Sequence, residues 1–180
     1  MLKTKNNNKA DPQIYIACLA AYNAGYLHGE WVDATQDIDI IRKEISRILE
    51  TSPVADAEEY AIHDYDEFYS AESILGEYPN LEEVVKAAEF IAEHGELAGK
   101  LIAHYGDLTE ALEAMEERYH GCYRSLADYA EQFTEDTSSD IPKHLQYYID
   151  YKKMARDWEY SGDIFTIELG FEEVHVFSNH

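Results

Sequence analysis

The central half of this chain is strongly acidic, and any fold that it adopts has to tolerate that charge. Residues 48–141 contain 24 Asp or Glu and only four Lys or Arg, a net charge of −20 over 94 residues. Like charges on one surface repel each other and disfavour a compact state. The 180-residue chain is nevertheless 46% hydrophobic and contains 15 Tyr, which is too apolar for a disordered acidic tail. The acid must therefore lie on the surface of folded structure.

The N-terminal third has the pattern of a small α+β unit. Asp37 precedes a helical repeat of Ile residues and is placed to cap a helix over 38–50, which Pro53 ends. Runs rich in β-branched and aromatic residues predict three strands, at 13–19, 27–34 and 59–65. These strands would form a small sheet with one helix packed on it.

The middle of the chain has a helical pattern, and strands return at its C-terminal end. Asn80 is placed to cap a helix that Gly95 ends. The other predicted helices are a short one around Ile74 and Leu75, then 97–105, 108–119, one from 126 with Leu126, Tyr129, Ala130 and Phe133 inward, and one near 144–151 that continues toward Trp158. Two closing strands are predicted at 164–169 and 174–177.

This order predicts an α+β protein, an elongated chain of three small domains in the order α+β, helical, α+β. No Gly-, Ser- or Pro-rich linker separates the parts, so we expect them to pack end to end through short connections. We assign a flexible basic tail to 1–11, an N-terminal α+β domain to 12–70, a helical acidic domain to 71–118 and a C-terminal α+β domain to 119–180.

Carboxylates recur opposite the apolar stripes of the central helices. Residues three or four positions apart lie on the same face of a helix, and each like-charged pair at that spacing costs about 0.2–0.5 kcal/mol. Such pairs with no base to relieve them are Glu89–Glu93, Glu113–Glu117 and Glu131–Glu135. The acidic rows comprise Glu82, Glu89, Glu93 and Glu96, then Glu110, Glu113, Glu116 and Glu117, and finally Asp128, Glu131 and Glu135.

Three interpretations of these rows are open: a solvated face that keeps the protein in solution, a halophilic surface, or a surrogate for nucleic acid. A halophilic surface would carry acid throughout and not mainly in the centre. Duplex DNA carries one charge per ~1.7 Å of axis, so a charge of −23 corresponds to about 39 Å of duplex. A surface this negative repels nucleic acid and anionic membranes, so its expected partners are basic proteins.

Sequence signatures of catalytic and cofactor sites are absent, so no catalytic residue and no cofactor is predicted. The chain has no glycine-rich phosphate loop, no H-E-x-x-H and no paired C-x-x-C. His63, Asp64 and Asp66, with Glu67 beside them, contain the donor atoms of a divalent-cation site. On a regular strand His63 and Asp64 would point to opposite faces, so ordinary hydrogen bonding is the simpler interpretation. Metal binding stays open as an alternative.

Few sequence features indicate the cellular compartment or the oligomeric state. Cys18 and Cys122 do not suggest a disulfide framework, and the chain has neither a signal segment nor a window of ~20 apolar residues, so a cytoplasmic protein is expected. Tyr147, Tyr148 and Tyr151 are too closely spaced for one helix face, so their segment either faces a second subunit or is a buried helix of the same chain. The candidate dimer-interface residues are Tyr129, Phe133, Tyr147, Tyr148 and Tyr151.

Three segments resemble the ArdA family of antirestriction proteins. They are 15–34 (YIACLAAYNAGYLHGEWVDA), 58–68 (EEYAIHDYDEF) and 145–168 (LQYYIDYKKMARDWEYSGDIFTIE). The resemblance runs in order from about residue 14 to residue 177, which leaves out only the Lys/Asn-rich start. Segment 125–137 lies where the family's antirestriction motif falls, but its residues differ, so only the location is carried over.

The resemblance implies an elongated, curved chain of three small domains that dimerises through its C-terminal part. It also implies a protein carried by mobile genetic elements, which protects incoming DNA from type I restriction–modification enzymes. Such a protein occupies the DNA-binding groove of the methyltransferase core as a surrogate for bent B-form DNA, through a distributed acidic surface and without a catalytic residue. The alternatives are an acidic adaptor for another basic DNA-binding protein and a divalent-metal-binding protein.

Overall fold

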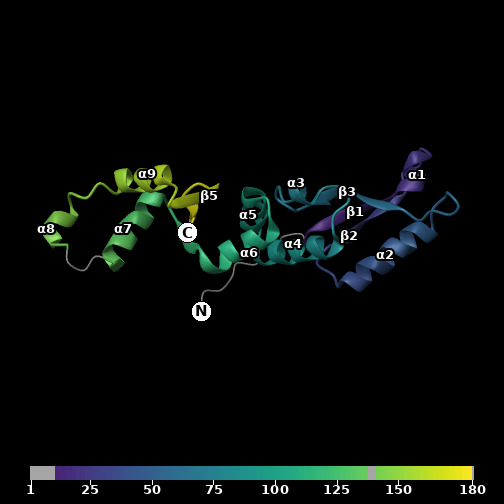
Figure 1. Ribbon diagram of the computed structural model, residues 1–180, viewed down its shortest axis with the longest axis horizontal. Coiled ribbons are helices and arrows are strands. Elements are labelled where there is room, and N and C mark those ends of the chain that lie inside the picture. The colour runs from purple at the N-terminus through teal and green to yellow at the C-terminus, as the bar shows by residue number, and fades with distance from the viewer. Residues whose placement is uncertain (1–10, 138–140, 180) are drawn as a thin grey trace. The chain divides into compact units, whose positions relative to one another are not determined.

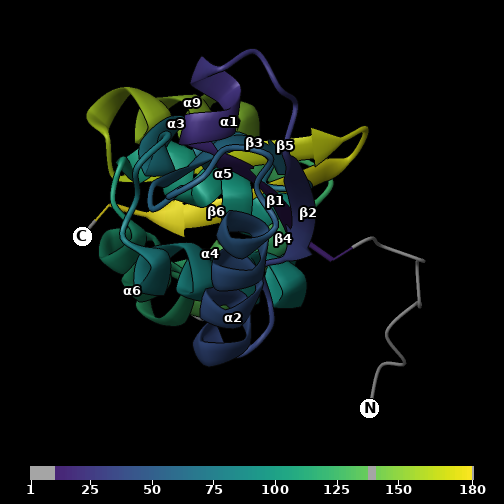
Figure 2. The ribbon, with the colours of Figure 1, turned by 90° about the vertical axis from the view of Figure 1, so that its right-hand side faces the viewer.

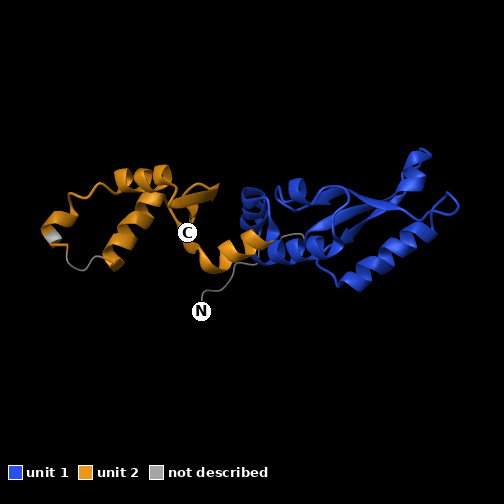
Figure 3. Ribbon diagram, in the orientation of Figure 1, with its two compact units in different colours: residues 1–108 blue, residues 109–180 orange. Residues whose placement is uncertain are grey.

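The computed structural model of the chain describes residues 11–137 and 141–179. The chain divides into two compact units, residues 1–108 and 109–180 (Figure 3). Each unit combines helices with a three-stranded antiparallel sheet (Figure 1), which confirms the predicted α+β class. The division into three domains stays a prediction, and residues 1–10 of the predicted basic tail lie outside the described residues.

Unit 1 is built on the sheet order β2-β1-β3, so the first strand of the chain is the central one. The side chains of Ile14 and Ile16 on this central strand are fully buried. The elements of unit 1 in chain order are β1 (Gln13–Cys18), α1 (Leu19–Asn23), β2 (Gly29–Asp33), α2 (Ile38–Glu50), β3 (Tyr60–Asp66), α3 (Glu72–Leu75), α4 (Leu81–His94) and α5 (Glu96–Tyr105).

Helix α2 begins and ends where the sequence predicts. The carboxylate of Asp37 accepts a hydrogen bond from the Asp39 amide at 2.8 Å, which satisfies one of the free N–H groups of the first turn. Ile41, Ile45 and Ile48 recur at helical spacing and are buried. Through them α2 packs on β1 and β2 (Figures 1 and 2).

Helices α4 and α5 belong to the same compact unit as the sheet, and α5 packs closely against the chain that follows β3. Asn80 caps α4 by accepting the Glu82 amide at 2.9 Å, and Gly95, at φ +70°, ends α4 as predicted. A Cβ added to Gly99 of α5 would lie 2.5 Å from the Phe68 carbonyl oxygen, so only glycine fits there. The chain after β3 and helix α5 therefore pack as neighbours within one unit.

Unit 2 has the sheet order β4-β6-β5, with α7 and α9 packed against each other beside it. Its core includes Leu126, Tyr129, Ala155, Ile164 and Val176. The elements, beginning with the helix at the boundary between the units, are α6 (Leu108–Glu117), β4 (Tyr119–Tyr123), α7 (Leu126–Thr137), α8 (Lys143–Gln146), α9 (Tyr151–Ser161), β5 (Ile164–Gly170) and β6 (Glu173–Ser178).

Strand β4 was not predicted, and it corrects the helix expected over 108–119. Tyr119 continues the helical stripe by spacing, yet it begins β4 and pairs with Phe177. The strand contains Gly121 at φ +116° and an irregular register between Tyr119 and Gly121, so it lacks the alternation that marks a strand in sequence.

Two helices occupy the region where one was predicted from 144 onward. Helix α8 ends at Gln146, and Asp150 caps a new helix, α9, by accepting the Lys153 amide at 3.0 Å. In α7 the inward position predicted for Phe133 is wrong, because its side chain is 40% exposed and Thr134 is buried instead. The closing strands β5 and β6 lie where they were predicted.

A buried histidine in β6 makes the stability of unit 2 depend on pH. The Tyr119 hydroxyl lies 2.7 Å from Nδ1 of His175, and burial lowers the pKa of His175 against the opposing effect of Glu173. Burial lowers the pKa of His120 as well. The charged form is thus disfavoured in the folded state, so the unfolded state takes up protons first as the pH falls below the ordinary value of about 6.5.

We expect the free energy of unfolding to be highest above about pH 6.5, the ordinary pKa of histidine, and to fall between pH 7.5 and pH 5.5. The fall should be smaller in His175→Gln, which still has the contribution of His120. Urea denaturation across this range measures both profiles. Parallel profiles of the wild type and the variant would show that His175 does not contribute.

Candidate functional site

The predicted acidic rows lie on the surfaces of four helices. Those on α4 and α5 belong to unit 1, and those on α6 and α7 belong to unit 2. Nine of the eleven carboxylate residues are exposed, and Glu96 and Asp128 are half-buried. Because each helix also buries an apolar stripe, its carboxylates are held at fixed positions on folded structure.

Four of the eleven carboxylates have an Arg or Lys partner. Most of these side chains are well exposed, so the pairs add little stability. The pairs are Arg42–Glu82 at 2.6 Å, Lys100–Glu96 at 2.9 Å, Arg118–Glu110 at 3.1 Å and Arg124–Asp128 at 3.4 Å. The His94 ring lies 3.8 Å from Glu93.

The remaining row carboxylates are not neutralised within the described part of the chain. Among the side chains that the structure describes, no Lys, Arg or His forms an ion pair with Glu89, Glu113, Glu116, Glu117, Glu131 or Glu135. Three of them lie close together on α6. These carboxylates are available to cations from outside the chain.

On unit 2 the α7 row borders a groove of about 590 Å³ between this helix and β4. Asp128, Glu131 and Glu135 line it, together with Asp136, which belongs to none of the predicted rows. Asp136 is adjacent in sequence to Glu135 and so falls outside the three- and four-residue spacing. The groove itself could not be foreseen, since one of its walls is the unpredicted strand β4.

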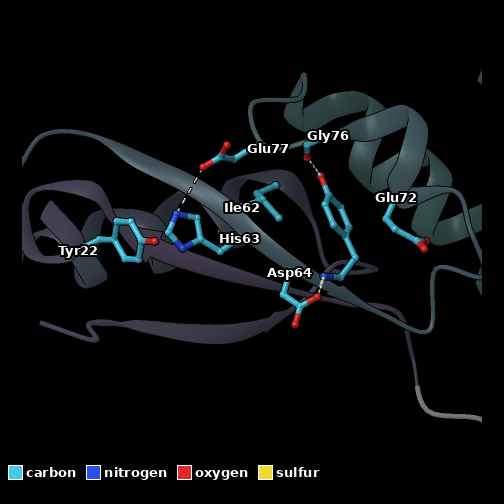
Figure 4. Close-up of a pocket in the computed structure, with 8 residues that line it drawn as sticks. Tyr22, Ile62, His63, Asp64, Glu72, Gly76 and Glu77 are labelled. Carbon is cyan, nitrogen blue, oxygen red and sulfur yellow. Dashed lines mark hydrogen bonds and ion pairs between the residues drawn. The ribbon is translucent and has the colours of Figure 1, made fainter. Parts of the chain in front are cut away.

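Unit 1 contains a second hollow, of about 460 Å³, around the residues of the metal alternative (Figure 4). His63 and Asp64 both line it, with Glu72 and Glu77, but Asp66 does not. In the described ranges no group of three or more His, Cys, Asp or Glu has the geometry to hold a metal ion. The structure therefore lends no support to the metal-site alternative.

The five candidate interface residues occupy different environments in unit 2. Tyr147 and Tyr148 are 89% and 79% exposed, whereas Tyr129 is 5% exposed and packs in the unit's own core. Tyr151 is half-buried. Phe133 lies at an apolar pocket of about 360 Å³, which Tyr129 also lines. Tyr147 and Tyr148 are thus the members most accessible to a partner.

The fold and the charged helices define a class: an acidic α+β protein with rows of exposed carboxylates on its helices. Among the helices described, none has the length and apolar character needed to cross a membrane. The chain belongs to the ArdA family, because the family model described as antirestriction protein (ArdA) matches residues 14–173. This family consists of non-enzymatic antirestriction proteins that act against restriction–modification enzymes. A search of curated proteins gave no match.

Proposed function

We propose that this protein mimics bent B-form DNA and inhibits type I restriction–modification enzymes by occupying the DNA-binding groove of their methyltransferase core. The observation that carries the proposal is the set of exposed row carboxylates without a cationic partner in the described chain. Membership of the ArdA family supports the antirestriction role. We place its action in the cytoplasm, where such enzymes meet DNA delivered by a mobile genetic element.

The mechanism is competitive electrostatic occlusion. A groove that neutralises phosphates with Lys and Arg meets carboxylates instead, and counterions are released from both surfaces, so the complex weakens as salt rises. Because the carboxylates sit on folded helices, binding avoids the ordering entropy that a disordered acidic segment would lose. The interaction is spread over many residues, so no single carboxylate dominates it.

We also propose that the protein is a homodimer, with the contact in the segment 142–161. A chain of net charge −23 repels its own copies, but this segment contains four basic and three acidic residues. Lys152, Lys153 and Arg156 are exposed on α9, close in sequence to the exposed Tyr147 and Tyr148. Two copies can therefore approach here with apolar surface to bury and little repulsion.

Phage plating tests the proposed function directly. Unmodified phage should plate with higher efficiency on cells that contain a type I restriction system when this protein is expressed, because the restriction enzyme is blocked. Cells without the system provide the control and should show no change. Equal restriction with and without the protein would contradict the proposal for that enzyme family.

A further inference from the structure

The hollow of about 460 Å³ on unit 1 combines carboxylates with aromatic walls (Figure 4). Tyr22 and His63 form one side, with ring centroids 4.8 Å apart and planes 80° to each other. Tyr65 lines the hollow as well, and its hydroxyl donates to the Gly76 carbonyl oxygen at 2.6 Å. The hollow is thus bordered by aromatic rings whose positions are fixed by the Tyr22–His63 contact and by the hydrogen bond of Tyr65.

A β-bulge brings consecutive residues into this one hollow. In the pairing of β3 with β1, Tyr15 lies opposite Asp64 and Ile16 lies opposite Ile62, so His63 is the extra residue. A bulge interrupts strict alternation and redirects side chains. His63, Asp64 and Tyr65 therefore all line the hollow, contrary to the expectation that His63 and Asp64 face opposite ways.

The carboxylates of the hollow have little compensation from the chain itself. Glu77 lies 3.6 Å from Nε2 of His63, and Asp64 accepts the Tyr65 amide at 2.9 Å. No Lys or Arg whose side chain the structure describes forms an ion pair with Asp64, Glu72 or Glu77. Burial raises the pKa of the Tyr65 hydroxyl, and the charge of Glu72 raises it further, so this group remains a neutral donor.

We propose that this hollow is a binding site for an arginine side chain of the basic partner. The inference rests on the proposed function, because a groove that binds DNA presents guanidinium groups for phosphates. A guanidinium carries several N–H donors in a plane, which suits carboxylates around a shared space, and it stacks on aromatic rings. The hollow is large enough for a side chain, and its aromatic lining suits a guanidinium better than a bare metal ion.

The same unit already holds a guanidinium in this way. Arg47 lies 2.6 Å from Glu30 and 2.7 Å from Glu44, which bind it from two elements. Hydrogen bonding to Arg47 holds the pKa of Glu30 below its ordinary value. The hollow at His63 is lined by three carboxylate residues and by aromatic rings, and no arginine of the described chain forms an ion pair with these carboxylates.

Titration of the full-length protein with N-acetylarginine amide, followed by NMR, tests the site. We expect saturable shifts of the Tyr22 and His63 ring signals, and binding at least about fivefold weaker for the matching lysine amide. Glu77→Gln and Tyr22→Ala should each weaken arginine binding about tenfold. Glu50→Gln matches the charge change of Glu77→Gln at an exposed position away from the hollow, and it should leave binding unchanged. Thermal unfolding confirms that each variant is folded.

Shifts that do not saturate, equal binding of lysine, or equal loss in Glu50→Gln would overturn the assignment. The partner is tested separately, by inhibition of a type I enzyme: Glu77→Gln and Tyr22→Ala should weaken inhibition more than Glu50→Gln does. Arginine binding with unaltered inhibition would overturn the role of the site in the complex. Arginine binding by a protein that inhibits no type I enzyme would instead refute the proposed function and leave the arginine site standing.

Discussion

Replacing Glu113, Glu116 and Glu117 together with Gln is expected to weaken the complex with the methyltransferase core and to flatten its dependence on salt. These carboxylates are exposed on α6, and none forms an ion pair in the described chain, whereas Glu110 of the same row binds Arg118. Each phosphate neutralised in a protein–DNA complex contributes about 0.9 to the slope of log K against log salt. If each carboxylate replaces one phosphate, the slope should fall by about 3. Titrations at a series of salt concentrations measure it.

A matched variant separates position from net charge. Glu50, Glu58 and Glu59 are exposed around the segment between α2 and β3, outside the rows, and replacing them with Gln changes the net charge by the same amount. The slope of this control should change by less than half as much as that of the α6 variant. If the two variants lose affinity and slope equally, total charge alone governs binding, and the α6 row is not the site.

Reversing two charges on α9 is expected to dissociate the proposed dimer. Lys152→Glu with Lys153→Glu changes the charge of segment 142–161 from +1 to −3, so two copies would meet as like charges. Like-charge juxtaposition across an interface costs several kcal/mol, which predicts that the affinity between the two copies falls by on the order of 100-fold. Sedimentation equilibrium measures the association.

The control for this variant is Lys43→Glu with Lys86→Glu, which makes the same change in net charge at exposed positions of unit 1. It should remain dimeric. A wild-type protein that sediments as a monomer would contradict the dimer itself. Equal dissociation of both variants would show that net charge, and not contact through segment 142–161, governs the association.

Local signals in the sequence predicted the elements whose ends are fixed by neighbouring residues. Helix α2 is the clearest example, since Asp37 caps it and the Ile spacing defines its buried face. Strand β4 was missed because its stability comes from pairing with β6, more than fifty residues away in the sequence, and Gly121 masks its pattern. Such pairing is decided by tertiary context and leaves little trace in a five-residue run.

In the candidate site, too, the locally determined features were predictable and those set by tertiary contacts were not. Helical spacing predicted which carboxylates share a face, and the structure places them on α4 to α7. The hollow at His63 could not be predicted, because it depends on one extra residue in β3 relative to β1. Regular alternation would have sent His63 and Asp64 to opposite faces. The partners of Glu82 and Glu110 likewise come from positions 40 and eight residues away in the sequence.

Competition with DNA on a purified type I methyltransferase core is the most direct test of the proposed mimicry. Labelled duplex containing the recognition site is titrated with the core at increasing concentrations of this protein. A DNA mimic should raise the apparent dissociation constant of the duplex in proportion to its own concentration, with no complex that contains both. A complex of the core with DNA and this protein together, or a dissociation constant that does not change, would contradict occupation of the DNA-binding groove.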